Sequence, residues 1–243
     1  MSRCLTTTEI SYTQVFSQAP RSGLHLCCSP GPHSPVGNLR STTGIGEILT
    51  CALDTADWFR YVIYNDPSWD PTTIGSDDYI NAARTNLFDI QTFNGNLSSV
   101  KDRGSKIIHW HGEADFIITS TNSPRYYEHV SATMGLSSSQ LDDFYRFFRV
   151  SGTGHCGGGE GAHAIGQGTG EVNSLDPKEN VLLALVDWVE NGSAPETLIG
   201  THWVNDTQSL GVEFQRVHCK YPKRNQYLGS GDPDIFESWE CVE

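Results

Sequence analysis

Apolar residues gather in short runs in the middle of the chain, and these runs predict strands. Residues 106–110 (KIIHW) and residues 144–150 (FYRFFRV) are both predicted to be buried strands. Between them, residues 123–134 (SPRYYEHVSATM) are predicted to form a helix, and a glycine-rich loop follows at residues 152–163. Because parallel strands require a crossover connection, this order predicts two parallel neighbours joined by a helix.

A further helix is predicted over residues 177–190. Asp176 is its expected N-cap, Pro177 takes the first helical position, and Glu179 completes a capping box. The run VLLALVDWV is apolar on nearly all sides, so we expect it to pack deeply against a sheet and to end at Asn191-Gly192. The alternation of strands and helices predicts an α/β layer architecture.

The N-terminal part of the chain has a different character. Residues 55–64 are predicted to be a helix with an aromatic and aliphatic face, and residues 76–88 a second helix capped by Ser76 or Asp77. The preceding stretch is rich in Ser, Thr, Pro and Gly and has no apolar period, which is typical of loop or disorder. We therefore expect an irregular, unrelated segment over residues 1–48 and a folded part over residues 49–243.

Composition narrows the class of protein. A formal net charge of −13 argues against nucleic-acid binding, which requires a basic surface, and no run approaches the ~20 apolar residues of a membrane span. Three Asn-x-Ser/Thr sequons, at Asn96, Asn191 and Asn205, are typical of a secreted glycoprotein. The first residues, MSRCLTTTEISYTQVF, do not have the pattern of a signal peptide.

A carboxylate and an imidazole follow the two predicted strands. Asp115 lies just after residues 106–110, and His155 lies just after residues 144–150. Loops at the carboxyl ends of neighbouring parallel strands share one edge of a sheet, where functional groups collect. A carboxylate bonded to one ring nitrogen orients a catalytic histidine. The alternative is that Asp115 is a turn residue and His155 an ordinary loop residue.

Several longer strings resemble the fungal tannase/feruloyl esterase family. They include WFRYVIYNDPSWD, KIIHWHGEADFIIT, FYRFFRVSGTGHCGGGEGAHAIGQ and YPKRNQYLGSGDPDIFESWECV. The resemblance implies a secreted α/β-hydrolase with a lid domain that cleaves esters of gallic, ferulic or related phenolic acids, including plant cell-wall esters, with a Ser-Asp-His triad. It implies that Asp115 is the triad acid and His155 the base, and that no cofactor takes part.

The resemblance also implies roles for three cysteines. Cys219 and Cys241 are expected to pair. Cys156 occupies the place of the family cysteine that directly follows the histidine and is disulfide-bonded to a cysteine beside the nucleophile. The family's nucleophile motif, Gly-Cys-Ser-x-Gly-Gly, is not present in this sequence.

The nearest string to that motif is Cys27-Cys28-Ser29-Pro30-Gly31, in which proline follows the serine and supplies no N–H to an oxyanion hole. The family's calcium-binding lid loop is also missing. We therefore expect a partial α/β-hydrolase fold that contains only the C-terminal strands and helices, and a truncated or misassembled product without the nucleophilic serine.

Two other functions remain open. His109 and His111, with Asp115, His155 and Cys156, offer enough ligands for a metal-dependent hydrolase, because alternate residues on a strand face the same side. The chain is also consistent with an inactive fragment that has no enzymatic function.

Overall fold

The computed structural model describes residues 55–90, 93–168 and 170–243, which fall into two compact units. One unit contains the described residues up to Phe93, and the other contains those from Asn94 to the C-terminus. Each unit is described by itself. The expectations for residues 1–48, for Ser29 and for the cysteines of that region lie outside the described residues.

The first unit packs its helices around aromatic side chains. It contains η2 (Trp58–Ile63), η3 (Pro71–Thr73), α3 (Ser76–Thr85) and η4 (Leu87–Asp89). Phe59 is buried at the centre, stacked on Trp69 and edge-on to Tyr79, with ring centroids 5.5 Å away in both cases.

Both helices expected in this unit form, with different details. The helix expected at residues 55–64 is a π-helix over most of its length, since Tyr64 N–H donates to the carbonyl of Phe59. The N-cap of α3 is Gly75, whose N–H donates to the Asp78 carboxylate, and not Ser76 or Asp77. This helix ends at Thr85 because the next residue, Asn86, is left-handed.

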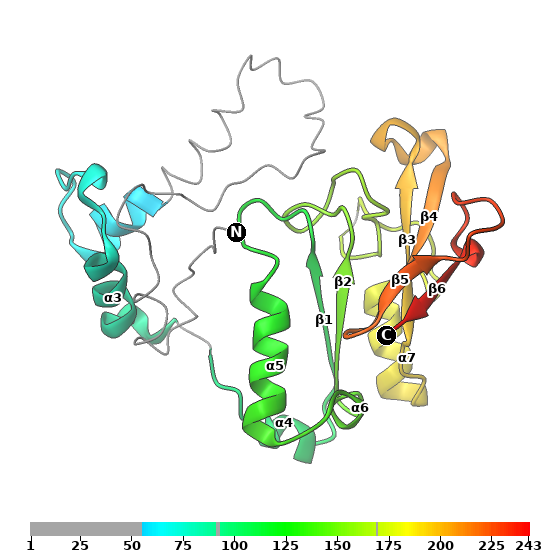
Figure 1. Ribbon diagram of the computed structural model, residues 1–243, viewed down its shortest axis with the longest axis horizontal. Helices are drawn as coiled ribbons and strands as arrows, with labels where there is room; N and C mark the ends of the chain where they lie inside the picture. The colour runs from blue at the N-terminus through cyan, green and yellow to red at the C-terminus, as the bar shows by residue number, and fades with distance from the viewer. Residues whose placement is uncertain (1–54, 91–92, 169) are drawn as a thin grey trace. The chain divides into compact units, whose positions relative to one another are not determined.

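A strand–helix–strand crossover forms the centre of the second unit (Figure 1). After α4 (Ser98–Asp102), strand β1 (Ile107–Gly112) leads into α5 (Asn122–Met134), and α6 (Ser138–Leu141) leads into β2 (Tyr145–Val150). The strands are parallel and in register from the Ile107–Tyr145 pair to the Gly112–Val150 pair. The predicted α/β arrangement of these elements is confirmed.

Helix α7 (Val181–Asn191) differs from two expectations, its first residue and its depth of burial. It begins four residues later than predicted, because the side chain of Asn180 accepts from Leu183 N–H as the cap. Asp176 instead accepts from Lys178 N–H in the preceding turn, and Glu179 bonds Asn173.

The burial of α7 also differs from the expectation of deep packing on nearly all sides. Val181, Ala184 and Trp188 are buried, whereas Leu182 is 62% exposed and Val189 61%. One face of the helix therefore packs within this unit. The helix ends at left-handed Gly192, as expected.

Two antiparallel hairpins complete the unit. Strand β3 (Thr197–Trp203) continues through η5 (Val204–Asp206) and η6 (Gln208–Leu210) and pairs with β4 (Val212–Cys219). Strand β5 (Arg224–Tyr227) pairs with β6 (Trp239–Val242), after η7 (Phe236–Ser238). A disulfide between Cys219 and Cys241 links β4 to β6, with Cα atoms 5.7 Å apart. These hairpins were not predicted from the sequence.

Candidate active site

Asp115 lies in the turn that follows β1, and its carboxylate is held by that turn. Its Oδ1 accepts the N–H groups of Ile117 and Ile118 at 2.9 and 2.8 Å. The side chain is only 5% exposed. These backbone bonds leave Oδ2 directed toward other partners.

His155 comes from the loop after β2 and meets this carboxylate. Its Nδ1 lies 3.0 Å from Asp115 Oδ2, and 37% of its side chain is exposed. The contact follows from the parallel pairing of β1 and β2, which brings the two loops to one edge of the sheet. The predicted acid–imidazole pair is therefore present as a contact.

The two loops approach so closely that the last residue of β1 must be glycine. A Cβ on Gly112 would lie 2.3 Å from the carbonyl oxygen of Thr153 and 2.5 Å from that of Gly154. Ala114 N–H donates to the same Thr153 carbonyl at 2.9 Å. The backbone of the Asp115 turn is thus fixed directly to the backbone beside His155.

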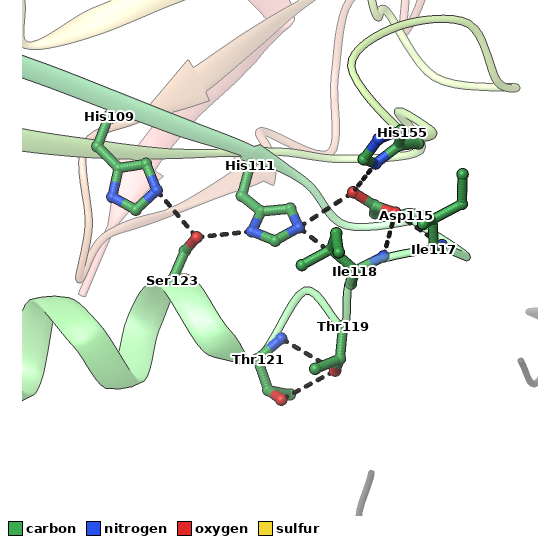
Figure 2. Close-up of polar contacts among 9 residues, drawn as sticks. All are labelled: His109, His111, Asp115, Ile117, Ile118, Thr119, Thr121, Ser123 and His155. Carbon is green, nitrogen blue, oxygen red and sulfur yellow. Dashed lines mark hydrogen bonds and ion pairs between the residues drawn. The ribbon is translucent and has the colours of Figure 1, made fainter. Parts of the chain in front are cut away.

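A second histidine reaches the same carboxylate. His111 Nε2 lies 3.3 Å from Asp115 Oδ2 and 3.3 Å from the carbonyl oxygen of Ile118. Its Nδ1 lies 2.6 Å from Ser123 Oγ, at the start of α5. Figure 2 shows His111 between the serine and the carboxylate.

The polar contacts continue along β1 away from Asp115. Ser123 Oγ lies 2.9 Å from His109 Nε2, and His109 Nδ1 lies 2.8 Å from the hydroxyl of Tyr145 (Figure 2 shows the serine and both β1 histidines). Burial, with a smaller electrostatic contribution from the neighbouring His111, lowers the pKa of His109 to about 4, so the His109 ring is neutral at pH 7. Burial raises the pKa of Tyr145, so its hydroxyl keeps its proton.

The direction of each hydrogen bond in this series follows from the oxygen atoms that face His111 Nε2. Nε2 of His111 faces only oxygens that accept, so it carries the proton, and Nδ1 of the neutral ring accepts from Ser123. Ser123 Oγ must then accept from His109 Nε2–H, and His109 Nδ1 accepts from Tyr145. All the donors in this series therefore point toward Asp115.

The surroundings of Asp115 favour its ionised form. Burial by itself would raise its pKa, but the hydrogen bonds from Ile118 N–H, His155 and Ile117 N–H outweigh burial and hold the pKa of Asp115 below its ordinary value. A carboxylate accepts the proton on His155 Nδ1. The Nε2 lone pair of His155 is then available to take a proton from a hydroxyl group, which is the requirement for a general base.

The other residues singled out in the sequence lie away from this pair or beside it. Cys156 follows His155, is exposed, and has a positive φ of 65°. It forms no disulfide within the described part of the chain. The sequon residues Asn96, Asn191 and Asn205 are all exposed.

The alternative metal site around His109 and His111 is not formed by the described residues. Within residues 55–90, 93–168 and 170–243, the one group of three His, Cys, Asp or Glu side chains close enough to share an ion lies elsewhere. The ring nitrogens of His109 and His111 are used instead for the hydrogen bonds to Tyr145, Ser123 and the carbonyl oxygen of Ile118.

Sequence reasoning missed the participation of Ser123 and Tyr145. The His109-x-His111 spacing was a signal that two imidazoles share one face of β1. Their common partner comes from the crossover helix, whose rotation about its axis is set by packing. The pattern of β1 alone could not identify it.

Comparison with known proteins gives the family. The family described as tannase and feruloyl esterase matches residues 56–242. The chain is 46% identical over 188 residues to "Probable feruloyl esterase B-2" of Aspergillus terreus, a match that covers 77% of this chain and 36% of the relative.

Two solved structures are also similar. An esterase from Aspergillus oryzae superposes with a TM-score of 0.75 at 44% identity, covering 77% of this chain and 37% of that one. Feruloyl esterase B from Aspergillus oryzae has a TM-score of 0.72 at 47% identity, with 76% and 36% covered. The chain thus spans about a third of the length of these relatives, and it belongs to the tannase and feruloyl esterase family.

Proposed function

We propose that this chain provides the acid and the base of a carboxylic ester hydrolase that acts by a Ser-Asp-His mechanism on esters of ferulic, gallic or related phenolic acids. The observation that carries the proposal is the 3.0 Å contact between His155 Nδ1 and Asp115 Oδ2 at the end of two parallel strands. Membership of a family whose relatives are named feruloyl esterases supports the substrate class, including phenolic esters of plant cell walls.

In this mechanism His155 Nε2 takes the proton of a serine hydroxyl as that oxygen attacks the ester carbonyl, and later returns a proton to the leaving alcohol. Asp115 stays ionised, because its three hydrogen-bond donors favour the charged form, and it stabilises the imidazolium formed during attack. His111 acts on Asp115 and not on substrate, so it is a positioning residue. The chemistry needs no cofactor.

We further propose that residues 49–243 are the C-terminal part of an α/β-hydrolase catalytic domain and that the nucleophile is not Ser29. In the part of the chain that the structure describes, no hydroxyl group is hydrogen-bonded to Nε2 of His155. The Gly-Cys-Ser-x-Gly-Gly string is absent from the sequence, and the chain spans 36% of its relative. If these residues are joined to a chain that contains the Gly-Cys-Ser-x-Gly-Gly motif, Cys156 would form a disulfide with the cysteine of that motif.

The decisive experiment places these residues in a longer relative. Residues 49–243 replace the matching C-terminal part of the Aspergillus oryzae feruloyl esterase B, and hydrolysis of methyl ferulate and methyl gallate is measured. We expect an active chimera in which Asp115→Asn and His155→Ala each lower kcat by about 10⁴-fold. Glu160→Gln, an exposed acidic residue of the same loop, is the matched control and should change little.

Two outcomes would contradict the proposal. If the His155→Ala or the Asp115→Asn chimera is as active as the Glu160→Gln control, the substituted residue has no catalytic role. Hydrolysis by the unmodified chain alone, abolished by Ser29→Ala, would instead make Ser29 the nucleophile.

We also propose that the protein is a secreted glycoprotein. The support is the exposure of all three sequon asparagines together with the Cys219–Cys241 disulfide, a bond that persists in oxidising compartments. Expression in a fungal host should yield protein in the medium whose mass falls on treatment with an endoglycosidase. Protein that is retained in the cell and carries no glycan would contradict this proposal.

A further inference from the structure

We propose that His163, His202 and Asp206 form a binding site for a divalent transition metal of the zinc class, separate from the Asp115–His155 pair. These three side chains are called the His163 cluster below. Their candidate ligand atoms all lie within 4.8 Å of one another. The site does not depend on the proposed esterase function.

His163 presents a free lone pair from a buried position. The residue is only 4% exposed, and its Nδ1 lies 3.0 Å from a carboxylate oxygen of Glu171. A carboxylate accepts, so Nδ1 carries the proton and Nε2 is unprotonated in the neutral ring. Among the described residues Nε2 has no hydrogen-bond partner, although Asp206 Oδ1 lies 3.5 Å away.

His202 presents its lone pair in the same way. Its Nδ1 lies 3.0 Å from the carbonyl oxygen of Gly161, which can only accept, so Nδ1 carries a proton and Nε2 bears the lone pair in the neutral ring. This Nε2 lies 3.8 Å from Asp206 Oδ1 and 3.7 Å from Glu213 Oε2. The rings of His163 and His202 are edge-on, with centroids 5.5 Å apart.

This arrangement is the one that holds zinc in proteins. Metal-binding histidines donate their second ring N–H to a carboxylate or a backbone carbonyl, as Glu171 and Gly161 accept here. Two imidazoles with a carboxylate suit zinc better than calcium, which prefers oxygen ligands alone. A metal ion would also occupy the position faced by the partnerless buried nitrogen of His163.

The remaining adjustment in ligand spacing falls on the most exposed ligand, Asp206. Zinc bonds of about 2.0–2.1 Å place tetrahedral ligand atoms roughly 3.4 Å apart, which is shorter than the widest spacing in the cluster. Asp206 is 69% exposed and lies in the short turn η5, so its side chain can rotate inward. Glu213 of β4, on the strand that pairs with β3, is the nearest fourth ligand.

Metal binding would join the loop that carries His155 to the β3–β4 hairpin. His163 lies eight residues after His155, and Ala164 already bridges to Thr201 of β3. Because a ligand that binds only the folded state stabilises it, the ion should raise the unfolding temperature of the whole unit.

The test uses the full chain after treatment with a chelator and desalting. Isothermal titration calorimetry with Zn²⁺ should give one ion per chain, and Zn²⁺ should raise Tm. Asp206→Asn and His202→Gln should weaken zinc binding at least about tenfold, and Glu171→Gln by about 10–100-fold through the orientation of His163. Asp102→Asn, an exposed aspartate on α4, is the matched control and should bind as the unmodified chain does.

Spectroscopy provides a second measurement, which a change in the stability of the protein alone would not affect. Co²⁺ in place of Zn²⁺ should give visible absorption of a tetrahedral nitrogen–oxygen site, and this should be lost in His202→Gln. The proposal is overturned if Zn²⁺ leaves Tm unchanged, or if Asp206→Asn and His202→Gln, both folded, bind it as tightly as Asp102→Asn.

Discussion

His111 and His155 meet on one oxygen of the same carboxylate, with their ring nitrogens 3.3 and 3.0 Å from Asp115 Oδ2. One histidine comes from β1 itself and the other from the loop after β2. The carboxylate is therefore positioned from two strands at once. It is also held through its other oxygen by two backbone N–H groups.

Substitution of His111 on β1 should impair catalysis without affecting substrate binding. In the active chimera, His111→Ala is expected to lower kcat about tenfold and leave KM unchanged, because Asp115 loses the imidazole 3.3 Å from its Oδ2 but keeps its three hydrogen-bond donors. His111→Gln can donate from its amide and should recover part of the rate. Measured kcat and KM check this, with His129→Ala on α5 as the control.

A merely structural role for His111 would give a different pattern. In that case His111→Ala and His111→Gln would lose activity in proportion to their loss of Tm, and KM would rise as well. Equal losses in both variants would therefore contradict positioning through Asp115.

A methyl group at the end of β1 should separate the two loops that carry Asp115 and His155. Gly112→Ala places a carbon 2.3 Å from the Thr153 carbonyl, which the backbone can relieve only by moving. We expect the free energy of unfolding to fall by about 1–3 kcal/mol. Gly170→Ala, whose Cβ would meet nothing within 4 Å, should be nearly neutral in the same chemical denaturation experiment. Equal stability of the two variants would refute the close contact between the loops.

Acid should destabilise the fold before its carboxylates titrate. Burial lowers the pKa of His218 to about 4, and burial together with His111 lowers the pKa of His109 to about 4. Unfolded imidazoles bind protons near pH 6.5, so between about pH 6.5 and 4 the unfolded state binds more protons and stability falls as the pH falls. Each group contributes up to about 1.4 kcal/mol per pH unit in that window.

The contribution of His218 can be isolated by substitution. His218 Nε2 bonds the carbonyl of Ala162, and a glutamine can donate to the same oxygen. Denaturant unfolding at several pH values should show a shallower slope in His218→Gln. A slope unchanged from that of the unmodified chain would show that the folded His218 titrates like an unfolded one.

The C-terminal disulfide should contribute substantially to stability. Cys219 and Cys241 are 22 residues apart, and closing a loop of this size stabilises a fold by about 3 kcal/mol through the unfolded chain. The double variant Cys219→Ala, Cys241→Ala should lower the free energy of unfolding by about 3 kcal/mol. Mutation of the exposed Cys156 to Ala is the matched control, and equal losses would contradict the assignment.

The strand–helix–strand centre was predictable because each element carries a local signal. Residues 106–110 and 144–150 are short runs rich in apolar residues, and the acid and the imidazole follow them. Because the carboxyl ends of neighbouring parallel strands share one edge of a sheet, the sequence predicted that Asp115 and His155 lie close together. The comparisons establish the family that those strings suggested.

What could not be predicted depends on competition between local hydrogen bonds and on long-range packing. The start of α7 moved because Asn180 caps it while Glu179 bonds Asn173, a choice that the Asp176-Pro177 signal does not contain. The hairpins β3–β4 and β5–β6 bury residues against partners distant in the sequence. Ser123 joins the site only because α5 packs with its first turn against β1.

The single direction of the hydrogen bonds from Tyr145 to Asp115 makes the imidazole tautomers interdependent. Loss of the phenolic donor at Tyr145 would leave His109 Nδ1 without that hydrogen bond, and the tautomer of the His109 ring would then be set from the Asp115 end alone. A buried phenol on one strand therefore helps to fix the orientation of two histidines on its neighbour.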